Sequence, residues 1–268
     1  MTLLEVHLWK IISLQRFNSK ITKSRKLFER KDLAQIDLDS TTIDGKRYYW
    51  TPDGALYPSV TSVLGSNQDK KAGLDKWRKQ VGEAKANQIS RRASDRGTAL
   101  HSICEDYLLN KDNYLDKRMP LHIELFSHIR PVLDENVEVI YGNELALFSH
   151  RLKTAGRTDM FCRFQGINTI VDFKTATKDK KEGWIEDYFL QSTCYAIMLE
   201  EVYKDLEPIH IPQIAIVIAV EDGENKQQLF VKRTSDYRDK VFAFFDEYHS
   251  KNELPKGVRT PSLFENIQ

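Results

Sequence analysis

The sequence predicts an α/β fold in which helices flank a central sheet of mixed strands, with a helical extension on the N-terminal side. Three observations indicate this fold. Short runs rich in β-branched and aromatic residues recur between positions 137 and 233. Segments with apolar residues at helical spacing lie before, between and after these runs. With 268 residues, 41% of them hydrophobic and 29% charged, the chain is long enough for one sizeable core.

Residues 1–42 are expected to form a separate basic segment. In its first 32 residues, eight lysines and arginines outnumber three acidic residues, and leucines and isoleucines supply an apolar side. This composition fits a basic arm or a helix packed on the body. It fits an organelle transit peptide only loosely, because acidic residues are present and serines are few.

Residues 43–136 are expected to form a short hairpin followed by a wall of helices. The hairpin covers 43–57 and turns at Asp53-Gly54. Residues 66–136 are mostly helical, with a break near 110–120, and apolar residues recur at helical spacing around position 103. His101 and Glu105 are four residues apart and therefore share a different face of that helix.

Residues 137–268 are expected to complete the core, so that 43–268 form one compact unit. The last helix ends before Pro255. The predicted order is strands near 137–148, 157–164 and 169–174, a helix from about 184 to 203, strands near 214–220 and 229–233, and a helix from 235 to about 251.

The most informative residues lie on two adjacent predicted strands. Gly156-Arg157-Thr158-Asp159 is followed, thirteen residues after the aspartate, by Asp172-Phe173-Lys174. The turn formers at 165–168 make the two runs a β-hairpin, which brings the two aspartates toward each other. Because side chains alternate along a strand, Asp172 and Lys174 share one face while Phe173 points to the other and enters the core.

Two carboxylates and a lysine in this arrangement are what a metal-dependent phosphodiester hydrolase needs. Mg²⁺ takes oxygen ligands and uses one or two carboxylates together with substrate phosphate. Asp159 and Asp172 form such a minimal site, and the main-chain carbonyl of Phe173 offers a further ligand. Lys174 is placed to orient or deprotonate the attacking water. The alternative, an Asp/Lys pair on the surface of a hairpin, is about equally compatible with these two motifs alone.

Two helices offer further residues to this site. His101 adds a nitrogen ligand, and a mixed nitrogen and oxygen site accepts Mn²⁺ as well as Mg²⁺. Gln191 and Tyr195, four residues apart on the helix near 184–203, are placed to point at the phosphate or at Lys174. The alternatives are a structural histidine and an ordinary half-buried helix.

Four motifs in order carry a family resemblance: G-T-x-x-H, G-R-x-D, D-F-K-T and Q-x-x-x-Y. Together they resemble the RecB-type exonuclease branch of the PD-(D/E)xK nuclease superfamily over about residues 57–203. Within that branch, segments 57–64 and 74–77 and the RGTALH helix look most like the mitochondrial genome maintenance exonuclease and its phage-encoded relatives.

The resemblance implies a PD-(D/E)xK fold and a role for each motif residue. His101, Asp159 and Asp172 inherit metal binding, Lys174 inherits the catalytic lysine, and Gln191 with Tyr195 inherits the supporting motif. Glu144 lies where relatives often have a strand glutamate before G-R-x-D. One residue of register would point it away from the metal.

The chain departs from those relatives that hold an iron–sulfur cluster through four cysteines. It has only Cys104, Cys162 and Cys194, without a CxxC pair, so no cluster is expected. All three lie in apolar, periodic segments, which favours buried free thiols in a reducing compartment.

Binding to nucleic acid has to come from local patches, because the net charge is only +1. The run Lys178-Asp179-Lys180-Lys181 follows D-F-K-T directly, and Trp77 and Trp184 lie beside basic groups where they could stack bases. Solvated faces and core packing are the commoner roles of such residues. The residues expected to contact substrate are Glu105, Glu144, Arg157, Thr175, Lys178 and Trp77.

The sequence therefore predicts a Mg²⁺- or Mn²⁺-dependent DNA exonuclease acting on single-stranded ends or flaps, in DNA replication, recombination, repair or phage DNA metabolism. A structure-specific endonuclease of the same superfamily and a non-catalytic nucleic-acid-binding module are the alternatives. No eighteen-residue apolar run suggests a membrane span. The expected location is intracellular, in the cytoplasm or that of an infected host, with the mitochondrion as an alternative.

Overall fold

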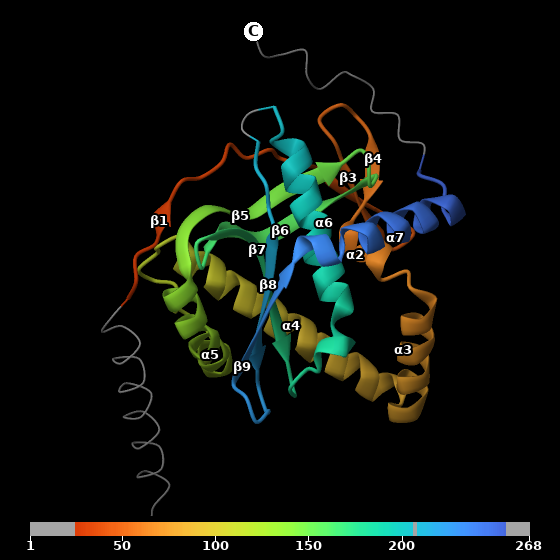
Figure 1. Ribbon diagram of the computed structural model, residues 1–268. Coiled ribbons are helices and arrows are strands. Elements are labelled where there is room, and N and C mark those ends of the chain that lie inside the picture. The colour runs from red at the N-terminus through yellow and green to blue at the C-terminus, as the bar shows by residue number, and fades with distance from the viewer. Residues whose placement is uncertain (1–24, 206–207, 256–268) are drawn as a thin grey trace, which may run out of the picture.

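The computed structural model describes residues 25–205 and 208–255, and it shows an α/β fold built on two sheets (Figure 1). The helices are α2 Val60–Leu64, α3 Gln68–Val81, α4 Glu83–Leu108, α5 Pro120–Asn136, α6 Glu186–Val202 and α7 Arg238–Lys251, with short 3₁₀ turns η1 Glu182–Trp184 and η2 Thr234–Asp236. The strands are β1 Glu29–Arg30, β2 Ser40–Ile43, β3 Lys46–Trp50, β4 Leu56–Pro58, β5 Val137–Ser149, β6 Thr154–Phe164, β7 Ile167–Ala176, β8 Gln213–Val220 and β9 Gln227–Arg233.

The larger sheet has the strand order β1-β5-β6-β7-β8-β9. Strand β6 runs antiparallel to both β5 and β7, β1 runs parallel to β5, β8 runs parallel to β7, and β9 returns antiparallel to β8. Helix α6 is the crossover between the parallel strands β7 and β8, which no short turn can join. The mixed sheet with flanking helices confirms the predicted fold class at this level.

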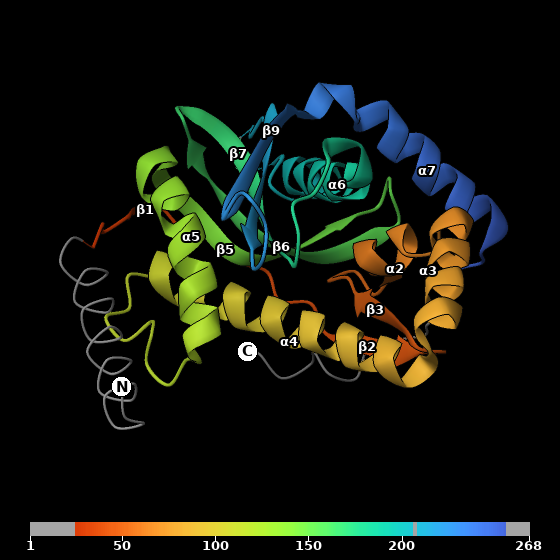
Figure 2. The ribbon, with the colours of Figure 1, turned by 90° about the horizontal axis from the view of Figure 1, so that it is seen from below.

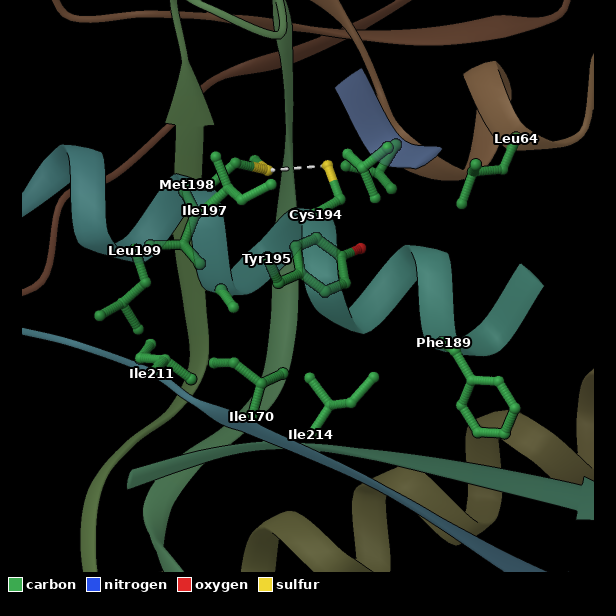
Figure 3. Close-up of a cluster of buried hydrophobic side chains, with 14 of the residues drawn as sticks. Leu64, Ile170, Phe189, Cys194, Tyr195, Ile197, Met198, Leu199, Ile211 and Ile214 are labelled. Atoms are coloured by element: carbon green, nitrogen blue, oxygen red, sulfur yellow. Dashed lines mark hydrogen bonds between the residues drawn. The ribbon is translucent and has the colours of Figure 1, made fainter. Parts of the chain in front are cut away.

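Helices cover both faces of this sheet (Figure 2). Helices α4 and α5 pack on one face, where Val171 and Phe173 of β7 point. Helix α6, with α2 and α7 outside it, packs on the other face against Ile170 of β7. Figure 3 shows Cys194, Tyr195 and Met198 of α6 among the apolar side chains of this second core. Because the two sides of β7 face different cores, its alternating residues are sorted between them.

The smaller sheet differs from the single hairpin expected over 43–57. The predicted turn at Asp53-Gly54 is present between β3 and β4, closed by a hydrogen bond from the amide of Gly54 to the carbonyl of Thr51. A third strand, β2, precedes it and pairs with β3. The added turn is Asp44-Gly45, where φ is 49° and 74°, a left-handed conformation that aspartate and glycine tolerate.

The described part of the N-terminal segment, residues 25–42, is extended rather than helical. Strand β1 adds an edge to the large sheet, parallel to β5. The amides of Lys31 and Leu33 continue the contact by donating to the carbonyls of Ile140 and Tyr141, both at 2.8 Å. Two residues of strand leave no periodic signal in a sequence, so this edge was not predicted. Residues 1–24 of the expected arm lie outside the described residues.

In the part of the chain that the structure describes, no helix is both long enough and apolar enough to cross a membrane. The three cysteines are buried and free of disulfides. Burial in apolar surroundings raises the pKa of the Cys104 and Cys194 thiols well above the ordinary value. They therefore behave as small apolar core side chains.

Candidate metal centre

The hairpin of β6 and β7 opens at the point where the two predicted aspartates lie. The strands pair as far as Met160 opposite Val171. Beyond that pair, the Asp159 side chain takes over the hydrogen bonding, because its Oδ2 accepts from the amide of Phe173 at 2.7 Å. The carboxylate of Asp159 is thereby fixed beside the carboxyl-terminal half of β7.

Helix α4 brings His101 to the same point. Its Nε2 lies 2.7 Å from the main-chain oxygen of Phe173, and its Nδ1 lies 3.4 Å from Asp159 Oδ1. When Nε2–H donates to that carbonyl, the Nδ1 lone pair of a neutral imidazole faces Asp159. Metal-binding histidines characteristically use the second ring nitrogen in this way, to donate to a carbonyl or carboxylate that fixes the ring.

Strand β5 supplies a third group, Glu144. Asn143 lies opposite Met160 and Leu145 opposite Thr158, so the register puts Glu144 beside Asp159 on the neighbouring strand. Its φ of 49° is left-handed, and Gly142 nearby is packed so closely against Leu145 that a side chain there would clash. One ligand atom from each of His101, Glu144 and Asp159 lies within 4.8 Å of the others.

We refer to His101, Glu144 and Asp159 as the trio. It brings two carboxyl groups and one imidazole close together, so their charges strongly affect one another. Burial, with the nearby Asp159 charge, raises the pKa of Glu144 to about 7. Burial opposes the charged form of His101, but Asp159 more than offsets this and raises its pKa to about 9. The pKa of Asp159 is held low despite its burial, because His101 and Lys174 stabilise the carboxylate. A cation between these groups would relieve the repulsion between Glu144 and Asp159.

Asp172 and Lys174 project together from β7, as predicted, while Phe173 is buried in the opposite core. Lys174 Nζ lies 2.5 Å from Asp172 Oδ2. Burial raises the pKa of Asp172 to about 6 against the opposing influence of the lysine. Burial disfavours the Lys174 ammonium, but Asp172 and Asp159 outweigh it and raise the lysine pKa, so the side chain is a cation at neutral pH.

Two expected ligands therefore have other partners in this structure. Asp172 forms an ion pair with Lys174 and does not belong to the trio found among the described residues. The Phe173 carbonyl accepts a hydrogen bond from His101, a member of the trio. Glu144 lies beside Asp159 with a ligand atom within 4.8 Å, while metal binding by Asp172 stays a prediction.

Gln191 and Tyr195 of α6 lie on the same side of the sheet as Lys174. Tyr195 is buried, and a hydrogen bond joins its hydroxyl to the Gln191 side chain. The ring lies against Gly156 of β6, where an added Cβ would come 3.0 Å from Tyr195 Cε1 and 3.2 Å from its hydroxyl oxygen. Gly156, the glycine of G-R-x-D, has no side chain and therefore leaves room for the ring of Tyr195, the tyrosine of Q-x-x-x-Y.

The other expected contact residues surround this centre at different distances. Glu105 is half-buried one helical turn beyond His101, and its charge contributes to raising the pKa of Glu144. Arg157 donates to the main-chain oxygen of Glu144 at 3.3 Å and to Asp37 at 3.2 Å. Thr175 continues β7 half-buried.

Lys178 and Trp77 lie in different surroundings. Lys178 is exposed and paired with Asp222 at 2.6 Å. Trp77 is half-buried on α3, and no contact in the structure joins it to the trio.

Sequence reasoning missed two groups that support the centre. Tyr188 of α6 lies under the Lys174 ammonium, with Nζ 5.1 Å from the ring centroid. It is three residues before Gln191 and seven before Tyr195, so helical spacing from those two residues is the signal that would have found it. Arg96 of α4 is buried and bonds Thr177 Oγ1 at 3.1 Å and Glu221, which ties α4 to the end of β7.

The donor set fits a divalent cation. An imidazole nitrogen and two carboxylates are ligands that Mn²⁺ accepts, and the carboxylates suit Mg²⁺. The Phe173 carbonyl, which orients the imidazole, is present. Burial, followed by the nearby Asp159 charge, raises the pKa of Glu144, and a bound cation would offset both effects.

Comparisons with known proteins add little to this geometry. No protein-family model matches the chain, and no curated protein matches it. Among solved structures, the chain is similar to one described as "Crystal structure of SSO0001", with 12% sequence identity, 68% of this chain and 72% of that chain covered, and a TM-score of 0.31. A similarity at that score carries no functional argument.

Proposed function

We propose that this protein is a divalent-metal-dependent deoxyribonuclease of the PD-(D/E)xK superfamily, RecB-type branch, acting as an exonuclease on single-stranded ends or flaps. One observation carries the proposal: the ligand trio His101, Glu144 and Asp159 lies beside the ion pair of half-buried Lys174 with buried Asp172, at the opening of the β6–β7 hairpin. Three convergent metal-ligand groups with an adjacent cation are the machinery of phosphodiester hydrolysis.

Each residue has a role that follows from its contacts. His101 Nδ1, Asp159 and Glu144 would hold Mg²⁺ or Mn²⁺, and the Phe173 carbonyl fixes the imidazole. The ion, when bound, supplies positive charge at the phosphate and lowers the pKa of a coordinated water. Lys174, held as a cation, donates to a phosphate oxygen or to the attacking water. Asp172 holds the lysine in place.

The supporting residues shape the face on which the phosphate would lie. Tyr188 covers the Lys174 ammonium, and Tyr195 fills the space above Gly156 with its hydroxyl bonded to Gln191. These aromatic walls keep bulk water from Lys174, which strengthens its interaction with an anion.

The test is cleavage of end-labelled linear single-stranded DNA in Mg²⁺ and in Mn²⁺, with a circular single strand and an RNA of the same sequence alongside. Metal-dependent loss of the linear DNA alone supports the exonuclease, and the labelled products give its polarity. Cleavage of the circle moves the protein to the endonuclease alternative. Binding of DNA without cleavage of any substrate, in either metal, contradicts the proposal and favours the non-catalytic module.

A further inference from the structure

A basic, aromatic-rimmed depression lies beside the start of α6. It consists of two hollows of 310 and 510 Å³, and Asn67 and Phe244 line both, so the hollows adjoin. The walls come from the α2–α3 junction, α7, the start of β3 and the η1–α6 junction. We refer to it as the α3–α7 groove. Each hollow has the size of a small-ligand site, about 300–1,000 Å³.

The charge of the groove favours an anion. Five lysines line it against three carboxylates. Each carboxylate is matched by a lysine, in the pairs Lys70–Asp187, Lys240–Glu186 and Lys251–Glu247. The remaining lysines, Lys46 and Lys71, both line the larger hollow, and among the described residues neither ammonium lies within ion-pair distance of a carboxylate.

Trp184 gives the groove a flat apolar surface at its rim. The side chain is 65% exposed, which is unusual for the largest apolar residue, and it lines the smaller hollow. The ammonium of Lys181 lies 5.3 Å from the centroid of its ring. An exposed indole beside cations is the arrangement on which unpaired bases stack while lysines hold the backbone.

The groove is close to the proposed catalytic lysine. Trp184 ends η1 and lies four residues before Tyr188, the α6 residue that covers Lys174, so the Cα atoms of the two aromatic residues are at most about 14 Å apart. Asp172 and Lys174 share the face of β7 that α6, α2 and α7 cover. A strand whose phosphate lies at Lys174 would therefore reach Trp184 within a few nucleotides.

We infer that the α3–α7 groove binds the backbone and one stacked base of single-stranded DNA leading to or from the metal centre. This inference rests on the proposed function for its direction, but the binding itself does not need cleavage. A duplex presents no exposed base face to Trp184, so the groove selects single strands. Lys46 and Lys71 neutralise phosphates, and Trp184 stacks a base.

Binding of a labelled oligodeoxythymidylate of about 16 nucleotides, measured in EDTA by fluorescence anisotropy over a series of salt concentrations, tests the inference. Trp184→Ala should weaken binding about tenfold. Lys46→Gln with Lys71→Gln should reduce the slope of log K against log salt by about 1.4, since each phosphate contact on a single strand contributes about 0.7. Lys204→Gln is the matched control, because this exposed lysine follows the far end of α6.

The outcomes separate this inference from the proposed function. Unchanged affinity and salt slope in the Trp184 and lysine variants overturn the inference, as does equal loss in Lys204→Gln, or a duplex that binds with the same dependence on Trp184. A parallel assay of bis(p-nitrophenyl) phosphate hydrolysis in Mn²⁺ tests the metal centre alone, because this substrate is too small to reach the groove. If the protein does not hydrolyse this substrate but the groove variants still weaken DNA binding, the proposed nuclease activity is contradicted and the inference about the groove stands.

Discussion

His101 Nε2 lies 2.7 Å from the main-chain oxygen of Phe173, so helix α4 and strand β7 are joined at the residue between Asp172 and Lys174. The same residue is also held by strand β6, because the amide of Phe173 donates to Asp159 Oδ2 at 2.7 Å. One residue of β7 is thus bonded to two members of the ligand trio. Any shift of this strand displaces the imidazole, the carboxylate and the lysine together.

Replacing Lys174 by alanine should abolish cleavage while single-stranded DNA binding remains. The change removes the cation that stabilises charge on the phosphate, and loss of such a donor costs about a hundredfold or more in rate. Single-turnover cleavage and a binding titration of the same sample measure the two effects. Lys204→Ala, which changes an exposed lysine beyond the far end of α6, is the control and should cleave at close to the wild-type rate. Wild-type rates in Lys174→Ala would remove this residue from the mechanism.

Replacing Glu144 by glutamine should weaken Mn²⁺ binding by at least tenfold. The amide offers a neutral oxygen in place of a charged ligand in the trio. Calorimetric titration of the metal into the protein measures this directly, without any DNA. Asp172→Asn should weaken Mn²⁺ binding less than Glu144→Gln does, since Asp172 is paired with Lys174. The reverse order would restore the ligand pair that the sequence alone suggested.

Without metal, the free energy of unfolding should fall as pH rises from about 4.5 to 9. The pKa of Glu144 is raised to about 7 in the folded protein, and that of His101 to about 9, so the native state binds protons more tightly than the unfolded chain. The Glu144 contribution is present below pH 4.5 and lost by pH 7. The His101 contribution is present below pH 6.5 and lost by pH 9.

The variant Glu144→Gln removes the Glu144 share of the loss in the lower part of this pH window, to which Asp172, with its pKa raised to about 6, also contributes. It should reduce the loss between pH 4.5 and 7 by on the order of 2 kcal/mol in urea unfolding of EDTA-treated protein. Glu138→Gln, an exposed glutamate on the same strand, is the control and should leave the profile unchanged. A stability that rises over this window in the wild type would contradict the assigned environment of Glu144.

Replacing Gly156 by alanine should destabilise the protein by about 1–3 kcal/mol. The added methyl group would meet the Tyr195 ring at 3.0 Å, and it would force that buried side chain away from Gln191. Urea unfolding measures the loss. Gly97→Ala on α4 is the matched control: nothing lies within 4 Å of its added Cβ, and helix propensity favours alanine there by up to about 1 kcal/mol. Equal stability of the two variants would show that the Tyr195 contact is loose.

Replacing Arg96 by alanine should cost about 1.5–3 kcal/mol of stability. Arg96 is 5% exposed and bonds Thr177 and Glu221, and its loss leaves Glu221 paired only with the exposed Arg92. Arg91→Ala, on the exposed face of the same helix, should change the unfolding free energy by less than about 1 kcal/mol, because its contact with Asp95 is 3.9 Å long and open to solvent. Thermal unfolding of both variants makes the comparison.

The β6–β7 hairpin and the faces of its residues were predictable because strand alternation is a local property. Gln165-Gly166 turns the chain with φ of 52° and 79°, and Phe173 enters the core while Asp172 and Lys174 face the other side. The helices over 66–136 and the Gln191–Tyr195 spacing also follow from local periodicity. Strands β1 and β2 were missed because two and four residues carry too little pattern.

The sequence by itself determined most of the helices and strands, the chemistry of their side chains and the side of the β6–β7 hairpin on which each side chain lies. Only the tertiary structure decided which of these groups meet. The β5–β6 register puts Glu144 beside Asp159, and the packing of α4 on the sheet brings His101 to the Phe173 carbonyl. The crossover of α6 places Tyr188 over Lys174. Register, helix docking and crossover depend on contacts between residues distant in the chain, and a local pattern holds no information about those distances.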